Sequence, residues 1–506
     1  MNRPPRRGRR PASAAAVARG LVVVATGALV LLAVLGAGDP LLLAAAAAGA
    51  ALAYPAAVIC VWTWRAWRAR RRLRLGAGPP PPFVLPPVEE LSCGQALARY
   101  CVNPRRFHPA EALELLIDGG QAFPRMLEAI DAARETIDLE AYILRDDATG
   151  RRFLEALRGA AGRGVEVRVL YDYVGSLSLP RSSIRALLSA GAAVAAYNPP
   201  VLARISWRGL NRRNHRKTLV ADGRVTFLGG MNLSDEYASS AGGGGGWRDT
   251  LVRIEGRAAA LQAALLFESA WRKSTPYRRA SRPGRRRRRL RAALRLLRQR
   301  AAARGRRASR QASRQAAPPE ACAGGPAVQV LGNRGFGNRR LIQRSYLQAI
   351  RKARRYILME NAYFIPNRAV RRALAEAVRR GVLVAVIVPH DSDVRIVACA
   401  GRFLYSRLLT AGVRLFEWPA GMMHAKTAVV DDAWSVVGSY NFDHRSLLHQ
   451  LESVAIVADG PFARRLRAQS LADLAASTEV RLATHESRPL RRLFAESAAY
   501  YVRHLL

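Results

Sequence analysis

Four chemically distinct side chains recur together at two places in the sequence. A histidine, a lysine, an aspartate and an asparagine occur in the stretch that begins at Asn211, and the stretch that begins at Gly421 repeats them in the same order. The two sets are His215, Lys217, Asp222 and Asn232, and His424, Lys426, Asp431 and Asn441. Each residue of the first set is separated from its counterpart by 209 residues, which indicates a duplicated unit.

These residue types suit the transfer of a phosphodiester group. One histidine can attack phosphorus while the other protonates the leaving alcohol and then acts as a base for the incoming one. Ammonium and amide groups can neutralise and hold the non-bridging oxygens, a task that a metal performs in other enzymes. We therefore expect no metal or other cofactor, and a phosphate-binding set that consists of Lys217, Asn232, Lys426, Ser439 and Asn441.

The local pattern around each histidine predicts two strands joined by a tight turn. In the first copy the pair Asp222-Gly223 is a hairpin signal, and the alternation along a strand places His215 and Lys217 on one side. Asp222 and Asp431 complete the two catalytic motifs, but their position at the turns predicts a structural role. Two copies that face each other would surround one cavity with two imidazoles, two ammoniums and two amides.

A histidine that acts as a nucleophile needs a carboxylate to fix its tautomer. Asp249 and Glu452 are the candidates for orienting the histidines. Each follows its own motif and opens a similar apolar strand.

The choice of lysine at two of these positions is informative. The chain contains 81 lysines and arginines, of which only four are lysines, namely Lys217, Lys273, Lys352 and Lys426. Two of the four stand two residues after a histidine at equivalent places, so a compact ammonium is required there and a planar guanidinium does not serve.

Helical and apolar extended patterns alternate on both sides of an arginine-rich segment. The order helix, strand, helix, strand begins at Gln121 and recurs from Leu341. This alternation predicts two duplicated α/β lobes, each with a largely parallel sheet, that share one active site. We place the lobes at residues 121–277 and 326–506, with a low-complexity linker at 278–325.

Residues 1–75 carry the pattern of a membrane anchor, and residues 76–120 that of a proline-rich linker and lead-in. Two uncharged stretches, Gly20 to Gly38 and Leu41 to Trp64, are each long enough to cross a ~30 Å hydrocarbon core as a helix. Arginines flank both outer ends and are absent from the connecting loop, which predicts a transmembrane hairpin with the catalytic lobes in the cytoplasm. A cleaved signal peptide is the alternative, but a second apolar stretch would not follow it.

The formal net charge of +44 indicates an anionic partner, and the abundance of arginine and alanine also points to a bias of the genome. The basic segment at 278–325 suits either a disordered, self-repelling linker or an arm that lies on anionic lipid. The five cysteines are scattered without Cys-x-x-Cys spacing, at Cys60, Cys93, Cys101, Cys322 and Cys399. We therefore expect neither a disulfide framework nor a zinc site, and thiols in a reducing compartment.

The repeated motif, His-x-Lys-x4-Asp-x6-Gly-[Gly/Ser]-x-Asn, resembles that of the phospholipase D superfamily. From Gln121 to the C-terminus, apart from the arginine-rich segment, the chain is similar to bacterial cardiolipin synthases. The resemblance implies an enzyme of the bacterial inner membrane that joins two phosphatidylglycerols into cardiolipin and releases glycerol, without a cofactor. It also implies that His215 is the nucleophile and His424 the acid and base, whereas the residues alone leave the reverse assignment open.

Two features depart from the family pattern. Gly230 replaces the hydroxyl residue that often follows the first motif's glycine, whereas Ser439 keeps it in the second copy. The run from Gly242 to Gly246, which precedes Trp247, is expected to be a flexible insertion, either on the substrate side or without a role.

Several functions share this chemistry. With water as the acceptor the site would be a phospholipase D-type hydrolase, and with ethanolamine or another alcohol it would make a different phospholipid. A nuclease of the superfamily fits the positive charge, but the predicted anchor and the lack of interleaved aromatics in the basic segment argue against a nucleic-acid partner. A non-catalytic membrane scaffold is disfavoured because both motifs are complete. The sequence leaves the acceptor alcohol and the oligomeric state open.

Overall fold

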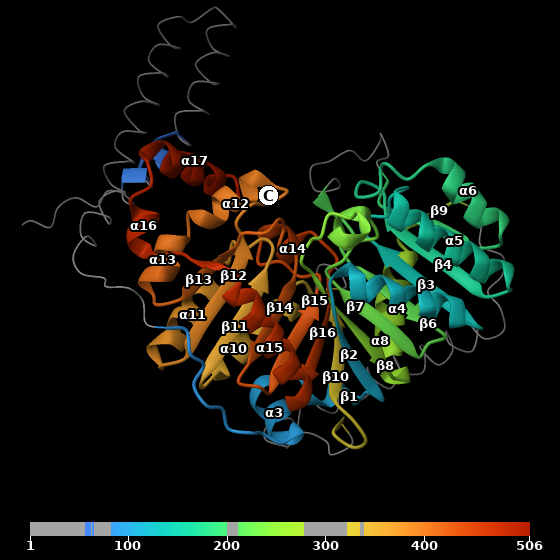
Figure 1. Ribbon diagram of the computed structural model, residues 1–506, viewed down its shortest axis with the longest axis horizontal. Helices are drawn as coiled ribbons and strands as arrows, with labels where there is room; N and C mark the ends of the chain where they lie inside the picture. The colour runs from blue at the N-terminus through green and yellow to red at the C-terminus, as the bar shows by residue number, and fades with distance from the viewer. Residues whose placement is uncertain are drawn as a thin grey trace, which may run out of the picture. The chain divides into compact units, whose positions relative to one another are not determined.

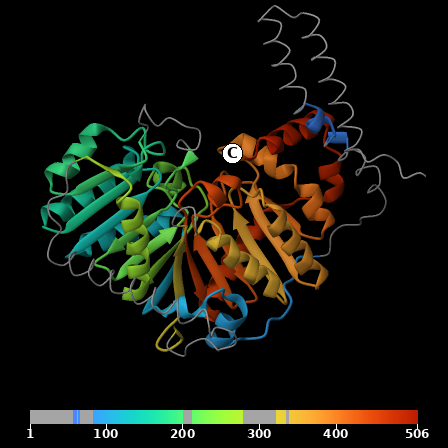
Figure 2. The same cartoon turned by 180° about the vertical axis from the view of Figure 1, so that it is seen from behind.

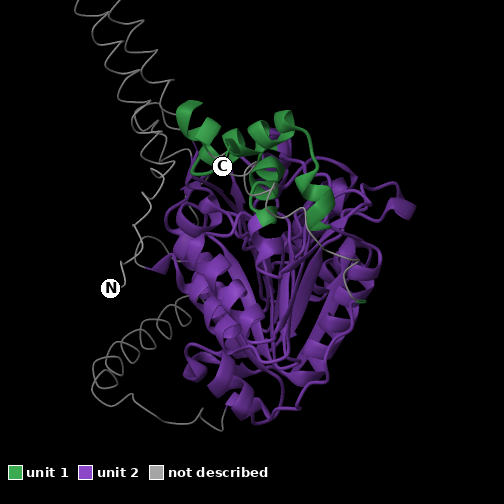
Figure 3. Ribbon diagram, turned by 90° about the vertical axis from the view of Figure 1, so that its left-hand side faces the viewer, with its two compact units in different colours: residues 1–82, 396–406, 481–506 green, residues 83–395, 407–480 purple. Residues whose placement is uncertain are grey.

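The computed structural model describes residues 56–61, 63–64, 82–199, 211–277, 321–333 and 338–505. The chain divides into two compact units (Figure 3). Unit 1 comprises Met1–Pro82, Ile396–Ser406 and Arg481–Leu506, and unit 2 comprises Phe83–Arg395 and Arg407–Val480.

The predicted membrane anchor and most of the arginine-rich segment lie outside the described residues. Of the two predicted spans, only residues 56–61 and 63–64 are described, and they are helical. Within the described ranges, no helix is both long and apolar enough to cross a bilayer.

Unit 2 contains two sheets, one for each copy of the repeated motif (Figure 1). The first has eight strands in the spatial order β2 (Ala112–Ile117), β8 (Thr250–Glu255), β7 (Val225–Gly229), β6 (Thr218–Ala221), β3 (Thr136–Ala141), β4 (Glu166–Asp172), β5 (Ala193–Tyr197) and β9 (Thr275–Pro276). Its helices are α4 (Asp118–Ala132), α5 (Ala148–Gly162), α6 (Arg181–Ser189) and α8 (Arg257–Trp271).

The second sheet has nine strands, and eight of them repeat the order of the first. The order is β1 (His108–Pro109), β10 (Ala327–Gly332), β16 (Ser453–Ala458), β15 (Trp434–Gly438), β14 (Lys426–Val430), β11 (Tyr356–Asn361), β12 (Leu383–Pro389), β13 (Arg414–Trp418) and β17 (Thr478–Glu479). Its helices are α10 (Leu341–Lys352), α11 (Arg368–Arg379), α13 (Tyr405–Thr410), α14 (His444–Leu448) and α15 (Gly460–Ala475). The predicted duplication of an α/β unit is confirmed.

The prediction of largely parallel sheets is wrong, because both sheets are mixed. Among the described strands, parallel pairing is confined to β3–β4–β5 and to β11–β12–β13. The helix–strand alternation builds only these three-stranded cores. The repeated motif adds an antiparallel hairpin beside each core, β6–β7 in one lobe and β14–β15 in the other.

Both faces of the first sheet are covered, which explains why its strands are apolar almost throughout. Leu219 and Ala221 of β6 pack in a core with α4, α5 and α6. The intervening Val220 points to the opposite face, into a core that includes α8.

That second core runs without interruption from one lobe to the other. It combines Leu228 of the first sheet with Val437 of the second, and Leu266 of α8 with Leu466 of α15. Two helices also contact the sheet of the opposite lobe, since α8 contacts β10 and α15 contacts β2. The two sheets therefore lie side by side, as the view from behind also shows (Figure 2).

Unit 1 is a small helical assembly. Its described helices include α12 (Arg395–Arg402), α16 (Leu482–Glu486) and α17 (Leu490–Tyr501). The rings of Phe403 and Tyr500 stack with their centroids 4.6 Å apart. The outer side of α17 leaves Leu490 and Phe494 exposed, with relative accessibilities of 56% and 48%.

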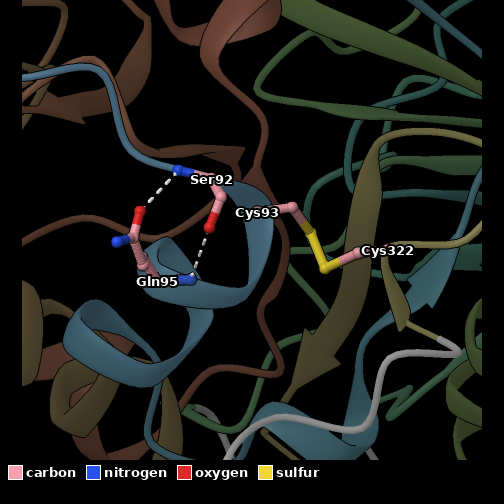
Figure 4. Close-up of a disulfide and its surroundings, with 4 residues drawn as sticks. All are labelled: Ser92, Cys93, Gln95 and Cys322. Carbon is pink, nitrogen blue, oxygen red and sulfur yellow. Dashed lines mark hydrogen bonds between the residues drawn. A yellow bond between two sulfur atoms is a disulfide. The ribbon is translucent and has the colours of Figure 1, made fainter.

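The stretch predicted as linker and lead-in holds structural elements as well. It contains α3 (Cys93–Tyr100), whose N-terminus is closed by a capping box in which Ser92 and Gln95 exchange hydrogen bonds (Figure 4). The helix packs against α10 and β16 of the second lobe.

A disulfide joins Cys93 at the start of α3 to Cys322 just before β10 (Figure 4). The expectation that all five cysteines are free thiols is therefore wrong for this pair. The two residues are 229 positions apart, so no short-range spacing marks them, and they meet only because α3 packs on the second lobe. Cys60, Cys101 and Cys399 are free.

Replacing Cys322 by serine is expected to lower the free energy of unfolding by about 2–4 kcal/mol, because the cross-link no longer restricts the unfolded chain. Chemical denaturation under oxidising conditions measures this change. Cys399→Ser, which removes a free thiol, is the control and should leave the unfolding midpoint in place. Maleimide labelling of both Cys93 and Cys322 without reduction would contradict the disulfide.

Candidate active site

Each copy of the motif folds as the predicted hairpin. Lys217 directly precedes β6 and Lys426 opens β14, and in each copy a second strand returns beside the first. The turn residues adopt left-handed backbone conformations, with φ of 51° at Asp222 and 50° at Asp431. Aspartate tolerates this conformation better than most residues do, which accounts for its place there.

The two motif aspartates bind backbone at the far end of the hairpins. The Asp222 carboxylate accepts hydrogen bonds from three consecutive N–H groups, those of Arg134, Glu135 and Thr136. The Asp431 carboxylate does the same with Arg354, Arg355 and Tyr356, and also accepts a bond from the Tyr100 hydroxyl. These contacts fix each hairpin to the preceding parallel strand, in agreement with a structural role.

Short backbone bridges join the lobes where the two histidines lie. The His215 N–H donates to the Leu451 carbonyl at 3.0 Å, just before Glu452. The His424 N–H donates to the Arg248 carbonyl at 2.7 Å, just before Asp249. Each histidine is thus placed beside the strand entrance of the opposite lobe.

Each histidine is therefore paired with the carboxylate of the opposite lobe, an arrangement that we call the crossed pairing. His215 Nδ1 lies 3.1 Å from both carboxylate oxygens of Glu452, and His424 Nδ1 lies 2.8 Å from Asp249 Oδ2. All four side chains are buried. A proton on Nδ1 donates to the carboxylate and leaves the Nε2 lone pair free, which is the tautomer that a nucleophile or a base requires.

The two carboxylates have different surroundings. Glu452 accepts hydrogen bonds from Ser439 Oγ and, at 2.7 Å, from Ser446 Oγ. In the first lobe Gly230 stands in place of Ser439, and a Cβ there would lie 2.4 Å from Asp249 Oδ1. The missing hydroxyl is therefore a matter of space, because the Asp249 carboxylate fills the position.

Both lysines are buried with the histidines. Lys217 Nζ donates to the His215 carbonyl at 2.8 Å, and Lys426 Nζ donates to the His424 carbonyl. Burial lowers the pKa of Lys217, and it lowers the pKa of Lys426 to about 8. Each ammonium keeps further N–H donors that can bind an anion.

Burial also governs the protonation of the two histidines and of their two carboxylate partners. It lowers the pKa of both imidazoles, and the nearby lysine charges lower it further. It raises the pKa of Asp249 and of Glu452 to about 7. Both imidazoles are consequently neutral at neutral pH, and an anionic phosphate among the lysines would lower the cost of charging one of them.

Asn232 and Ser439, two members of the predicted phosphate-binding set, already have hydrogen-bond partners. Asn232 accepts a hydrogen bond from the Ile143 N–H and donates to the Tyr237 hydroxyl at 2.7 Å. Ser439 bonds to Glu452. Asn441 is buried, and its Oδ1 has no partner within the described residues.

Sequence reasoning missed the aromatic side chains around the histidines. The ring of Tyr142 lies 4.9 Å from that of His215, and the rings of Tyr237, Trp247 and Tyr363 lie 5.3, 5.7 and 6.4 Å from that of His424. Their positions follow from loops rather than from a periodic pattern. The one available signal was the position of Trp247, two residues before the candidate Asp249.

The glycine run before Trp247 is folded, contrary to the expectation of a flexible insertion. The N–H groups of Gly244, Gly245 and Gly246 donate to carbonyls of residues 235–239, at 2.8–3.0 Å. A Cβ at Gly244 would lie 2.5 Å from Ala238, so glycine is needed for this tight turn.

Among the described residues, no group of three or more His, Cys, Asp or Glu side chains is arranged to hold a metal ion.

Comparisons with known proteins agree with this site. A family model described as "Cardiolipin synthase, PLD-like domain" matches residues 126–271 and 346–473. A cardiolipin synthase of Staphylococcus aureus is 31% identical over 386 residues, which are 76% of this chain and 71% of the relative. Cardiolipin synthase B of Escherichia coli is 34% identical over 355 residues, 70% of this chain and 78% of the relative.

A solved structure shows the same fold. The crystal structure of a phosphatidylserine synthase from Haemophilus influenzae aligns with a TM-score of 0.60 at 15% identity, and the match covers 82% of this chain and 100% of that one. The fold and the duplicated motif define a phospholipase D-like enzyme, a phosphatidyltransferase. Within that class, the chain belongs to the cardiolipin synthase family.

The crossed pairing predicts which carboxylate supports which histidine. Asp249→Asn is expected to lower kcat by about 100-fold or more and to change the tautomer of His424 alone. Glu452→Gln should change the tautomer of His215 alone. Nitrogen-15 spectra of labelled histidine in the two variants distinguish the rings, and a change at His215 caused by Asp249→Asn would contradict the pairing.

The pKa of Lys426 predicts a loss of activity in alkaline solution. Since its pKa is about 8, the ammonium is charged below about pH 8 and becomes neutral above it, so kcat/KM should fall as the pH rises through that value. Lys426→Arg keeps a charge at this position at every pH and should weaken this decline, at a lower maximal rate, and the decline that is left belongs to Lys217, whose pKa burial also lowers. Lys352→Arg, at an exposed site, is the control, and the decline should persist in it.

Proposed function

We propose that this enzyme joins two phosphatidylglycerols into cardiolipin and releases glycerol, through a covalent phosphatidyl-histidine intermediate. The observation that carries the proposal is the crossed pair of buried histidine–carboxylate contacts between two lysines. The names of the relatives, which are cardiolipin synthases, supply the product, and the site supplies the chemistry.

In the first step, His215 Nε2 attacks the phosphorus of one phosphatidylglycerol. The P–O bond to glycerol breaks, and His424, which takes up a proton on Nε2 when the anionic phosphate binds, donates that proton to the departing oxygen. We assign the nucleophile to His215 because Glu452 is held by two serine hydroxyls. These hydroxyls hold the carboxylate in place and lower its pKa against the effect of burial, which favours the charged form beside the positive ring that forms when Nε2 bonds to phosphorus.

In the second step, the hydroxyl of another phosphatidylglycerol attacks the intermediate. His424, now neutral, takes the hydroxyl proton, and the P–N bond to His215 breaks. Both steps pass through a phosphorus centre with extra negative charge, which the ammoniums of Lys217 and Lys426 neutralise in a buried site.

The structure suggests a narrower phosphate-binding set than the sequence did. Asn232 and Ser439 already bind Tyr237 and Glu452, so we propose that they act on the site through those groups. Lys217 and Lys426 then contact the phosphate directly. For Asn441, which is buried, we propose that the Nδ2 group donates to a phosphate oxygen beside them.

We further propose that the enzyme works at a membrane that contains its anionic lipid substrate. In unit 1, α17 exposes Leu490 and Phe494 next to Arg491 and Arg492, which suits contact with anionic headgroups. The transmembrane hairpin remains a prediction from the sequence. The arginines beside it favour cytoplasmic lobes, whereas the Cys93–Cys322 disulfide favours an oxidising compartment.

The test is an assay of the full chain in micelles of detergent and phosphatidylglycerol without added metal. Cardiolipin and glycerol should appear in equal amounts, and both should vanish with His215→Ala and with His424→Ala. Phosphatidic acid alone would identify a hydrolase. Cleavage of single-stranded nucleic acid would identify a nuclease, and inactivity on every substrate would leave a scaffold.

The two histidines can be told apart with a phosphatidyl ester of p-nitrophenol, a leaving group that needs no proton. His424→Ala should release nitrophenol in a burst and accumulate the phosphatidyl-enzyme, because the first step proceeds and the second lacks its base. His215→Ala should show neither. The opposite result would exchange the two roles.

A further inference from the structure

We propose that Trp247, with Tyr237 and Tyr363, keeps water away from the acceptor position and so directs the phosphatidyl group to an alcohol. The inference rests on the proposed function, in which His424 receives the proton of the incoming hydroxyl. It concerns the selection of the acceptor. The catalytic residues do not discriminate between water and an alcohol, since both react by the same steps.

The aromatic surroundings of the two histidines are unequal. Among the described residues, one ring, that of Tyr142, contacts His215, whereas three rings lie around His424. Tyr237 is buried, and its hydroxyl lies 3.2 Å from His424 Nδ1. Trp247 and Tyr363 are only partly buried, so both reach solvent, whereas the His424 imidazole that they contact is buried.

Trp247 is held in place by the turn that precedes it. The backbone N–H of Trp247 donates to the Glu236 carbonyl at 2.9 Å, and the glycine run makes further backbone hydrogen bonds to the same segment. Its ring packs edge-on against Tyr237, with centroids 5.1 Å apart. A bulky ring on a fixed turn can exclude small molecules, which a ring on a flexible loop would not do.

The position of Trp247 beside His424 matters in the second step, when the acceptor approaches. The P–N bond of the intermediate breaks while a new P–O bond forms, and the proton of the attacking oxygen passes to His424 Nε2. If that oxygen belongs to phosphatidylglycerol, the product is cardiolipin, and if it belongs to water, the product is phosphatidic acid. Water is far more abundant than any lipid hydroxyl, so transfer requires that the approach to His424 be dry before the lipid arrives.

The experiment measures the ratio of phosphatidic acid to cardiolipin made by the full chain in phosphatidylglycerol micelles. Trp247→Ala is expected to raise this ratio by about tenfold or more. Trp247→Phe, which keeps an aromatic ring, should stay near the wild-type ratio. Trp271→Ala removes another partly buried tryptophan of the same lobe, stacked on Phe267, and should leave the ratio unchanged.

The ratio does not depend on how much of each variant is folded, so a loss of stability cannot imitate the effect. An unchanged ratio in Trp247→Ala, at any total activity, would overturn the inference. A raised ratio in Trp271→Ala would overturn it too, because the effect would then not be specific to this position. Wild-type enzyme that makes no cardiolipin would instead refute the proposed function, and this result is visible before any variant is tested.

Discussion

Each histidine of this site depends on a carboxylate that the opposite lobe supplies. The pairs are His215–Glu452 and His424–Asp249. Both lie at the junction of the two sheets, so the orientation of each imidazole depends on how the lobes dock and not on either sheet alone. The backbone bridges at Leu451 and Arg248 fix the spacing, and a shared core closes around α8 and α15. The two lobes therefore have to dock in a single register for either imidazole to carry the right tautomer.

Burying this many charges would be destabilising without partners for each of them. Arg248 shows how the protein meets that requirement. Its guanidinium binds the Asp473 carboxylate, the Asp249 carbonyl and the Thr250 hydroxyl, and lies 3.8 Å from Glu360. Arg216, a second buried arginine of the same lobe, donates to backbone carbonyls of both lobes, those of Leu266, Asn333 and Glu452. The junction is thus polar at its centre and apolar around it, and the polar part fixes the docking geometry.

Much of this site could be read from the sequence because the duplication made it visible twice. The constant offset identified His215 and His424, and the opening position of two similar strands identified Asp249 and Glu452. The sequence did not reveal that each carboxylate pairs with the histidine of the opposite lobe, because proximity in the sequence suggests that a carboxylate contacts the histidine of its own motif. Only the three-dimensional docking decides otherwise.

Other features carry no local signal at all. The pairing of Cys93 with Cys322 depends on where α3 packs, and the antiparallel hairpins interrupt sheets whose helix–strand rhythm suggests parallel order. The glycines before Trp247 have the composition of a flexible segment, but their backbone hydrogen bonds lock the turn.

The crossed pairing also has a consequence for the protein as it is being made. The first lobe leaves the ribosome with its histidine, its lysine and the complete β6–β7 hairpin, yet the partner of His215 lies at the entrance of β16. Glu452 is synthesised 237 residues after His215. A half-finished chain, or a fragment that contains one lobe, holds a histidine whose tautomer is unspecified. Both histidine–carboxylate pairs are therefore complete only after the second lobe has folded against the first.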